Sequence, residues 1–205
     1  MSTVPDKNLF QQMYTGRPPW DIDGPQKSFV TVADKISGSV LDAGCGTGEN
    51  ALYFAGRGCQ LTGIDFVEAA IHQAQRKATD RGVSARFVLQ DALQLTSIPD
   101  RFDNIIDSGL FHCFSDADRA QYVKGLATVL KPDGQLFVLC FSDKEPGTQG
   151  PRRVSKQELH EAFAHGWTIE SIAPIHFEVR LDFTEMQFSE GGPHGWFVIV
   201  RRTGG

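Results

Sequence analysis

The sequence has few cysteines, and their spacing argues against a disulfide framework or a zinc site. Only four occur in 205 residues, and no two of them form a C-x-x-C pair. Each lies within an apolar or glycine-rich stretch, and they are Cys45, Cys59, Cys113 and Cys140. This pattern indicates reduced thiols in a reducing compartment. We expect no metal site in this protein.

The chain also lacks long apolar runs and an excess of positive charge. No apolar run approaches the roughly 20 residues that cross a membrane. The first residues, Met1 to Lys7, show no charged-then-apolar signal pattern. The net charge is −5, whereas a non-specific nucleic-acid binder normally carries a basic face. We therefore expect a cytoplasmic monomer or homodimer with no membrane or nucleic-acid partner.

What the chain does contain is enough apolar sequence for a sizeable core. Hydrophobic residues make up 40% and charged residues 22%, which is typical of a globular protein, and we expect one domain over residues 1–205. Strand-like runs alternate with helical patterns, as in a parallel sheet covered by helices. The expected strands are one ending at Val40–Asp42, then Gln60–Asp65, Arg86–Gln90, Asp103–Ser108, Gln135–Phe141, Trp167–Phe183 and Trp196–Arg202, the last two antiparallel.

The expected helices between these strands are Gly48–Arg57, Ala69–Arg81, Asp116–Leu130 and Val154–Phe163. Residues 1–35 have a different pattern. A short helix over Lys7–Tyr14 cannot continue through Pro18 and Pro19, because proline breaks helices. A further helix is expected over Pro25–Ile36. We interpret residues 1–35 as a helical cap lying over the sheet.

A glycine loop, Gly44-Cys45-Gly46-Thr47-Gly48, follows the first strand directly and precedes a helix. In this setting backbone N–H groups and the helix N-terminus can approach a ligand beyond the carboxyl ends of the strands. A side chain at Gly44 or Gly46 would block that approach. The spacing is G-x-G-x-G rather than the dinucleotide pattern G-x-G-x-x-G, so the loop alone is a weak signal.

Two acidic residues strengthen the prediction that the glycine loop binds a ligand. Asp65 ends the second strand, where a carboxylate can accept hydrogen bonds from ribose hydroxyls. Asp91 ends the third strand, where an acceptor can meet the exocyclic amine of an adenine. The alternative is that each acid only caps the helix that follows it. Their occurrence in phase with the glycine loop favours ligand binding.

The ordered motifs resemble the class I S-adenosylmethionine (SAM)-dependent methyltransferases. The matching segments are Leu41–Gly48, Gly63–Asp65, Gln90–Ala92, Phe102–Asp107 and Leu130–Leu136. The resemblance implies a Rossmann-like α/β fold: seven strands, mostly parallel with an antiparallel last strand, and helices on both faces. It implies SAM as cofactor and S-adenosylhomocysteine (SAH) as product. The cofactor-binding residues expected from it are Trp20, Gly44, Cys45, Gly46, Thr47, Asp65, Phe66, Asp91, Ala92 and Ser108, with Asp42 as a supporting acid.

Three shorter segments are similar to the branch of thiol, thiopurine, halide and tellurite-resistance methyltransferases. They are Pro18–Ile22, Ile106–His112 and Gly147–Pro151. Mycobacterial enzymes that methylate heterocyclic toxins carry a stretch similar to the second segment. The resemblance implies a small-molecule acceptor, such as a thiol, a heterocycle or a phenol, in detoxification or secondary metabolism.

Methyl transfer from a sulfonium is an in-line displacement that requires alignment and exclusion of water. A neutral acceptor also needs a base, and His112 is the best-placed candidate for this catalytic role. The alternative is that His112 hydrogen-bonds the backbone or packs on the cofactor. Trp20 offers an aromatic face to the sulfonium. The expected substrate pocket consists of Phe10, Tyr14, Phe111 and His112.

Other functions stay open at this point. A non-catalytic SAM-binding module would carry the same motifs. An NAD(P)-dependent oxidoreductase would share the sheet, but Tyr122 is followed by Leu126 rather than by the lysine of a Y-x-x-x-K pair. An adenine-directed nucleic-acid methyltransferase would carry an N-P-P-Y-like segment where this chain has Asp107–Leu110.

Overall fold

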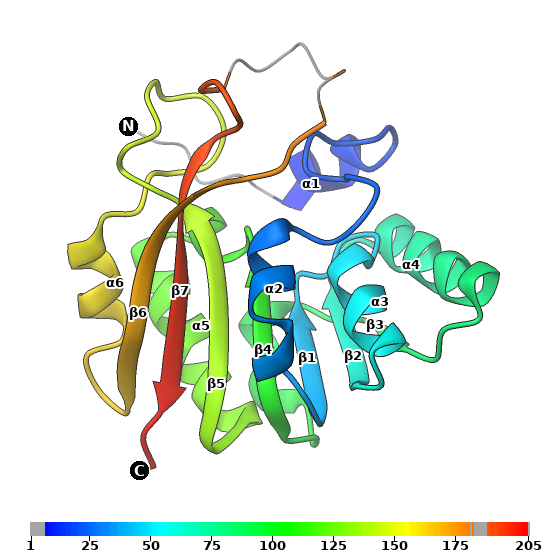
Figure 1. Ribbon diagram of the computed structural model, residues 1–205, viewed down its shortest axis with the longest axis horizontal. Helices are drawn as coiled ribbons and strands as arrows, with labels where there is room; N and C mark the ends of the chain where they lie inside the picture. The colour runs from blue at the N-terminus through cyan, green and yellow to red at the C-terminus, as the bar shows by residue number, and fades with distance from the viewer. Residues whose placement is uncertain (1–6, 181, 183–187, 205) are drawn as a thin grey trace.

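The structure is a computed structural model that describes residues 7–180, 182 and 188–204. Its centre is a seven-stranded sheet with the strand order β3-β2-β1-β4-β5-β7-β6 (Figure 1). The strands are β1 (Ser39–Ala43), β2 (Gln60–Asp65), β3 (Arg86–Leu89), β4 (Phe102–Ser108), β5 (Leu130–Phe141), β6 (Trp167–His176) and β7 (His194–Arg202). The helices are α1 (Lys7–Met13), α2 (Lys27–Thr31), α3 (Glu49–Gly56), α4 (Glu68–Arg81), α5 (Asp116–Val129) and α6 (Lys156–Ala162). Three short 3-10 helices are η1 (Ala33–Lys35), η2 (Ala92–Ser97) and η3 (Phe111–Cys113).

Strands β1 to β5 pair in parallel, and β7 pairs antiparallel with both β5 and β6. The expectation of a mostly parallel sheet with an antiparallel last strand is confirmed. The strand order reverses between β1 and β4, since the chain builds β2 and β3 on one side and β4 and β5 on the other. Open α/β sheets bind ligands at the carboxyl ends of the strands beside such a switch point.

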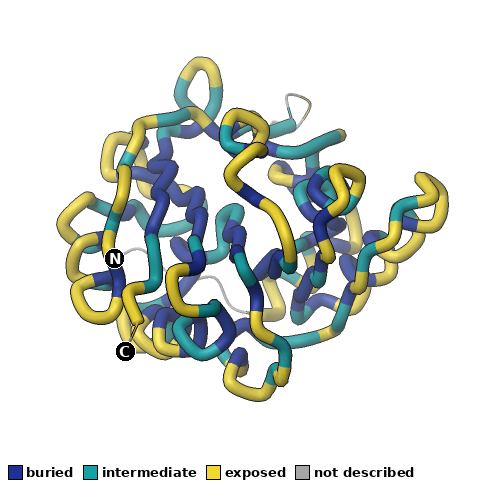
Figure 2. Tube along the Cα trace, turned by 60° about the horizontal axis from the view of Figure 1, so that its bottom comes forward, coloured by how far each residue is buried: buried dark blue, intermediate teal, exposed yellow. Residues whose placement is uncertain are grey.

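Helices cover both faces of the sheet, as expected. Alternate residues of each strand point to opposite faces. On one face, strand side chains such as Leu41 and Ile105 pack with η2, α5 and α6. On the other face, Val40 and Ile106 pack with α2, α3 and α4. Figure 2 shows buried segments along the central strands and exposed ones on the outer helices and loops.

One expected helix is wrong. The continuous helix predicted over Pro25–Ile36 is divided into α2 and η1, with Val32 between them at φ −114°. Val30, Thr31 and Val32 are all β-branched, and such residues lose side-chain freedom in a helix. A short apolar helix therefore ends where three of them follow one another.

Two strand boundaries also differ from the expectation. β5 begins at Leu130, which pairs with Phe102, and its regular pairing resumes only at Gln135. Residues 131–134 therefore interrupt the strand as an irregularity, with Asp133 at φ 62°. β6 ends at His176, so the strand predicted to reach Phe183 is shorter, and residues 181 and 183 lie outside the described part of the chain. Among the described residues, no helix has the length and apolar character needed to cross a bilayer.

Candidate active site

The glycine loop leaves the carboxyl end of β1 in a conformation that requires glycine. Gly44, Gly46 and Gly48 have φ values of 73°, 53° and 88°, which residues with a side chain rarely adopt. The backbone N–H groups of Gly44 and Cys45 both donate to the Ile64 carbonyl, at 2.9 and 2.8 Å. The loop is thus anchored to β2, and its tight path places it at the switch point of the sheet.

Asp65 lies at the end of β2, directly beside this loop. Its carboxylate accepts hydrogen bonds from the backbone N–H of Gly46 (2.9 Å) and of Val67 (2.8 Å). Burial raises the pKa of Asp65, and these hydrogen bonds act in the opposite direction. The expected position of the acid is confirmed. Val67 is itself the N-cap residue of α4, so this bond fixes the turn before the helix and does not cap the helix.

Asp91 follows β3 at the same edge of the sheet. Its carboxylate accepts a hydrogen bond from the N–H of Leu93 (2.9 Å) and forms an ion pair with Lys7 of α1. Ala92 is buried at the start of η2, next to this acid. Ser108 ends β4 and is half-buried. Asp91 therefore caps a helix and, at the same time, offers its second oxygen to a cation.

The N-terminal cap lies over the ends of the parallel strands (Figure 1). Its aromatic rings form a cluster in which Phe10 contacts Trp20 and Phe66 edge-on, at centroid distances of 5.9 and 5.8 Å. Trp20 Nε1 donates to the Tyr14 hydroxyl at 3.0 Å. A Cβ atom at Gly46 would lie 2.6 Å from that hydroxyl oxygen. Tyr14 therefore packs directly on the glycine loop.

Thr47 joins the cap to α4. Its hydroxyl donates to Asp21 of the cap and accepts a hydrogen bond from Lys77 of α4 at 2.7 Å. Lys77 also pairs with Glu49 at 2.8 Å, and Arg81 with Glu49 at 2.7 Å. These contacts connect the cap, α4 and the start of α3. The Thr47 hydroxyl, which we expected to bind the cofactor, forms two of these hydrogen bonds.

Asp42 and Asp107 form an acidic interior beneath the loop. Both oxygens of Asp42 are enclosed and have no hydrogen-bond partner of ordinary geometry among the described residues. The nearby backbone N–H of Ala51 lowers the pKa of Asp42 only as the smallest of the causes that act on it. Burial, with Asp107 and Asp65 nearby, raises the pKa of Asp42 to about 8. Burial raises the pKa of Asp107 to about 6, although Tyr122 donates to it at 2.9 Å and Leu110 N–H at 2.9 Å. At neutral pH the Asp42 carboxyl is therefore mostly protonated, and a cation bound beside it would favour its ionised form.

His112 lies in η3, just after β4. Its Nδ1 atom accepts a hydrogen bond from the backbone N–H of Phe141 at 2.8 Å. The ring contacts Phe141 at 4.8 Å and Phe177 at 6.0 Å between centroids. Burial, together with Arg153 and Arg119, lowers the pKa of His112 to about 3. The side chain is therefore neutral and lies in an aromatic environment.

Phe111, which the sequence placed in the substrate pocket, belongs to the core. It is fully buried and stacks on Phe163 of α6 with centroids 5.7 Å apart. Adjacent residues in a 3-10 turn point in different directions. Phe111 therefore faces the helices while His112 faces Phe141 and Phe177. Phe114 is also buried and packs on Tyr122, with ring centroids 4.8 Å apart.

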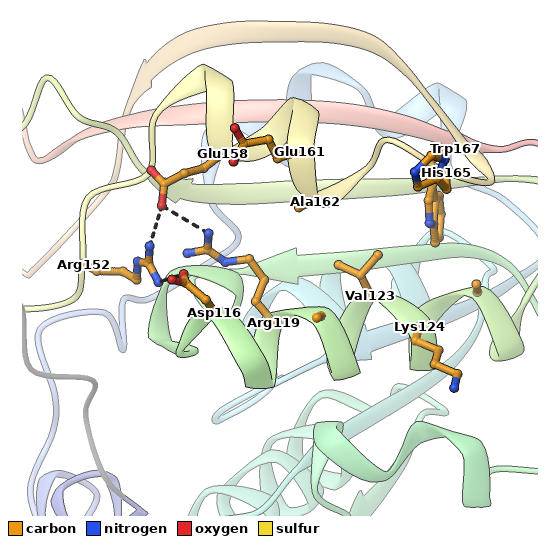
Figure 3. Close-up of a pocket in the computed structure, with 12 residues that line it drawn as sticks. Asp116, Arg119, Val123, Lys124, Arg152, Glu158, Glu161, Ala162, His165 and Trp167 are labelled. Atoms are coloured by element: carbon orange, nitrogen blue, oxygen red, sulfur yellow. Dashed lines mark hydrogen bonds and ion pairs between the residues drawn. The ribbon is translucent and has the colours of Figure 1, made fainter.

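A groove of about 560 Å³ lies outside this site, between α5 and α6 (Figure 3). Glu158 accepts hydrogen bonds from Arg119 at 3.3 Å and from Arg152. Arg152 also pairs with Asp116 at 2.6 Å, and its side chain is only 19% exposed. The Arg119 guanidinium covers the Phe111 ring at 4.6 Å. This charged cluster therefore contacts η3 through Phe111.

Two residues at the site, Lys7 and Phe177, were not predicted from the sequence. Lys7 reaches Asp91 from far along the chain, and Phe177 reaches His112 from the end of β6. Neither residue belongs to a motif, and both contacts depend on long-range packing. Among the described residues, no three His, Cys, Asp or Glu side chains are grouped so as to hold a metal ion.

Comparison with known proteins gives consistent results. Residues 40–134 match the methyltransferase domain family. The chain is 34% identical over 199 residues to a 2-heptyl-1-hydroxyquinolin-4(1H)-one methyltransferase of Mycobacteroides abscessus, covering 91% of this chain and 86% of that protein. A solved structure reported for the conversion of a disulfide bond into a thioacetal group during echinomycin biosynthesis has a TM-score of 0.85 and 36% identity, over 97% of this chain and 93% of that one.

A third similar protein was crystallised with its ligands. The 1,6-didemethyltoxoflavin-N1-methyltransferase of Burkholderia thailandensis, with bound 1,6-didemethyltoxoflavin and SAH, has a TM-score of 0.68 and 25% identity, over 86% of this chain and 76% of that chain. The resemblance inferred from the motifs is confirmed. Because the Mycobacteroides relative aligns along nearly the whole chain, and the family match includes the glycine loop and both strand-end acids, this protein belongs to the SAM-dependent methyltransferases.

Proposed function

We propose that this methyltransferase acts on a small thiol, phenol-like or heterocyclic acceptor. The cofactor lies between the glycine loop and the strand-end acids, and the acceptor lies beside His112. Residues 7–24 cover both as a cap, whereas α2 and η1 pack on a face of the sheet, and we treat the chain as a single domain. The observation that carries this proposal is the unpaired, buried carboxylate of Asp42 beneath the glycine loop.

The residues present fit a cationic cofactor. Asp42 is affected by the charges of Asp65 and Asp107, and no cation is among the causes of its raised pKa. SAM carries a sulfonium and an ammonium, so its bound form supplies both a compensating charge and an electrophilic methyl group. Backbone N–H groups of the glycine loop, the carboxylate of Asp65 and the carboxylate of Asp91 are the groups that would hold it. Trp20, Cys45, Phe66, Ala92 and Ser108 border the same edge, and we assign them supporting contacts.

The acceptor side is supported by the environment of His112. Phe141 and Phe177 contact it, and Phe188 contacts Phe141 at 6.1 Å. Aromatic side chains of this kind suit a flat acceptor. The relatives named for a hydroxyquinolone and for a toxoflavin precursor act on such molecules, as their names state. Phe10 and Tyr14 of the cap complete the pocket in this proposal, whereas Phe111 supports it from the core.

Calorimetry with SAH tests the cofactor site. We expect wild-type protein to bind SAH and Asp65→Ala to bind it at least tenfold more weakly, since a hydrogen bond to a charged group contributes about 1.5–3 kcal/mol. Asp34→Ala is the matched control, because the Asp34 side chain is 97% exposed beside Arg57. Equal affinity of all three proteins would contradict the assignment of Asp65.

Labelled SAM tests the acceptor class. Purified protein is incubated with a panel of thiols, phenols, hydroxylated heterocycles and amines, and methylated products are identified by mass. Product from at least one small acceptor supports the proposal. SAH binding without methylation of any acceptor in the panel would favour the non-catalytic SAM-binding alternative.

A further inference from the structure

The hydrogen bond to His112 determines which of its ring nitrogens carries the proton. The backbone N–H of Phe141 donates to Nδ1 at 2.8 Å. A backbone amide is only a donor at its nitrogen, so Nδ1 must present a lone pair. In a neutral imidazole the proton then lies on Nε2. The free side of the ring is therefore an N–H donor.

Burial lowers the pKa of His112 most, and two charged groups add to this effect and keep the ring neutral. They are Arg153, from the loop after β5, and Arg119, from α5, and both are cations. Arg153 lies over the Phe141 ring at 5.3 Å, and its guanidinium donates to the carbonyls of Glu145 (3.1 Å) and Pro151 (2.6 Å). An imidazolium at His112 would be buried and repelled by both guanidinium groups. Taking a proton at this position is therefore strongly unfavourable.

The Nε2 atom faces the turn that borders the glycine loop. It lies 3.5 Å from the position that a Cβ atom of Gly109 would occupy. The next residue, Leu110, lies 3.0 Å from the corresponding position of Gly44. Among the described residues Nε2 makes no hydrogen bond. It is also not one of the fully enclosed side-chain atoms without partners, which belong to Asp42 and Arg119. The donor is thus available on the side of the cofactor loop.

Resting on the proposed function, we propose that His112 is a fixed hydrogen-bond donor rather than a base, and that the acceptor is methylated as an anion. The acceptor class is an ionised thiol, acidic phenol or hydroxylated heterocycle whose S⁻ or O⁻ accepts the Nε2–H bond. A lone pair of this anion forms the new bond to the methyl carbon. The bond between that carbon and the sulfonium sulfur breaks, its electron pair stays on sulfur, and SAH and the neutral methylated product result. The acceptor loses its proton to solvent before binding, so no proton moves in the transfer step.

The same geometry explains selectivity. A hydrogen bond from Nε2–H to an anion is of the charge-assisted kind and is strengthened in a site that excludes water. A neutral primary or secondary amine presents its own N–H donors to Nε2–H and finds no base there. Amines are therefore rejected, although SAM methylates amines in other active sites.

The pH dependence of kcat/KM distinguishes a donor from a base. A series of thiophenols or phenols that differ only in ring substituents, and therefore in acidity, is assayed with SAM from pH 5 to 9. We expect the acid limb of each profile to move with the solution pKa of the acceptor used, because only the ionised acceptor reacts. An acid limb at one fixed pH for all acceptors, or equal rates for amines of the same shape, would overturn the proposal.

Two variants separate donation from packing. The amide of His112→Gln retains an N–H donor, and we expect kcat/KM within about tenfold of wild type, whereas loss of a general base costs about 10²–10⁴-fold. His112→Phe removes the donor, and we expect a loss of about 10- to 100-fold for ionised acceptors. A loss for His112→Gln as large as for His112→Phe would overturn the proposal. SAH affinity is measured for each variant, so that failure of the cofactor site is recognised separately.

The tautomer itself is tested without catalysis. In ¹⁵N-histidine-labelled protein, two-bond ¹H–¹⁵N spectra identify which nitrogen of His112 is protonated, with His112→Gln used to assign its signals. We expect a proton on Nε2 and none on Nδ1 from pH 5 to 8. A protonated Nδ1, or an imidazolium in this range, would overturn the proposal even if SAH binds normally.

Discussion

Gly46 combines two constraints that can be measured separately. Its φ of 53° is costly for a residue with a side chain, and an added Cβ would lie 2.6 Å from the Tyr14 hydroxyl. We expect Gly46→Ala to lower the free energy of unfolding by about 1–2 kcal/mol from the backbone conformation alone. The steric conflict adds to this and displaces the cap. Urea unfolding and proteolysis of residues 7–20 measure the two effects.

The double variant Gly46→Ala, Tyr14→Phe isolates the steric part. Removing the hydroxyl leaves the Tyr14 ring carbon Cζ at 3.7 Å from the added Cβ, an ordinary contact. Proteolysis of the cap should therefore return toward that of Tyr14→Phe, while the backbone cost persists. Gly56→Ala is the control, because no atom lies within 4 Å of its added Cβ. Additive effects of the two substitutions would show that Tyr14 does not lie on the loop.

Single residues of the site were predictable where their signal is local. The glycine loop, Asp65 and Asp91 follow directly from strand ends in the sequence, and the structure places all three at one edge. The orientation of neighbours in a short turn is not local in this sense. Phe111 and His112 are adjacent, yet one is core and the other faces Phe141, because packing against α6 decides the rotation of η3.

Helix α1 is joined to Asp91 by an ion pair, which a cofactor bound as we propose would have to replace. Lys7 occupies one oxygen of Asp91, and the Lys7 side chain is 59% exposed. Exposed ion pairs contribute about 0.2–1 kcal/mol. We therefore expect Lys7→Met to tighten SAH binding by no more than about fivefold, an effect that shrinks at high salt.

Lys27→Met is the control for Lys7→Met, since Lys27 pairs with Glu178 at 3.5 Å and is 84% exposed. Calorimetry at low and high salt gives both affinities. Weaker SAH binding by Lys7→Met at every salt concentration would mean that α1 helps to hold the cofactor rather than competing for Asp91.

Glu158 stabilises helix α6 in two ways, by capping its N-terminus and by forming ion pairs with two arginines. With Ser155 it forms a capping box, and its carboxylate also receives Arg119 and Arg152. Arg119 already has two enclosed nitrogens, Nε and Nη2, without partners among the described residues. Glu158→Ala removes a cap and leaves that guanidinium without its anion, so we expect a loss of about 1–3 kcal/mol in the free energy of unfolding.

Glu161→Ala, one turn further along α6, is the matched control for Glu158→Ala. Glu161 lines the same groove and accepts one hydrogen bond, from Gln157 at 2.8 Å. Urea unfolding should show a change within about 0.5 kcal/mol, as for most surface substitutions. If both variants lost the same free energy of unfolding, any negative charge lining the groove would stabilise α6 equally. The capping box of Glu158 and its ion pairs with Arg119 and Arg152 would then have no special role.

At the level of elements, alternation of apolar runs predicted the strands and most helices. The failures have distinct causes. The capping box of α6 was predictable because it is written in four consecutive residues, from Ser155 to Glu158. The division of the Pro25–Ile36 helix follows from the β-branched residues Val30, Thr31 and Val32, a local signal that the pattern of apolar residues does not contain. The end of β6 depends on pairing with β7, far along the chain.

For the molecule as a whole, the sheet concentrates buried carboxyl groups near the carboxyl ends of its parallel strands. The parallel strands β1, β2 and β4 carry Asp42, Asp65 and Asp107 close together, and burial raises the pKa of each of them. Topology could be predicted from the sequence, and with it the position of these acids. Their raised pKa values depend on how deeply each carboxyl is buried and on which hydrogen-bond partners it has, and only the folded structure shows these.

The buried charge makes stability depend on pH in a definite direction. Asp42 has a pKa of about 8 in the folded protein against an ordinary value of 3.8. Between these values the folded state binds more protons than the unfolded state, so stability falls as pH rises from about 4 to about 8 and is flat above. Asp107, with a pKa of about 6, acts in the same direction over a narrower window. We expect Asp42→Asn to remove the first contribution and keep the second.

Urea unfolding of wild type and Asp42→Asn from pH 5 to pH 8 measures this difference. The two stabilities should be closest at pH 5 and separate toward pH 8, with the variant more stable there, by at most about 1.4 kcal/mol per pH unit for one proton. Asp34→Asn, at a side chain that is 97% exposed, should follow the wild-type curve. Parallel curves for wild type and Asp42→Asn would mean that Asp42 is already compensated. In that case the unpaired carboxylate would no longer indicate a site for a cationic cofactor, because a cation could gain nothing from a charge that the protein itself has neutralised.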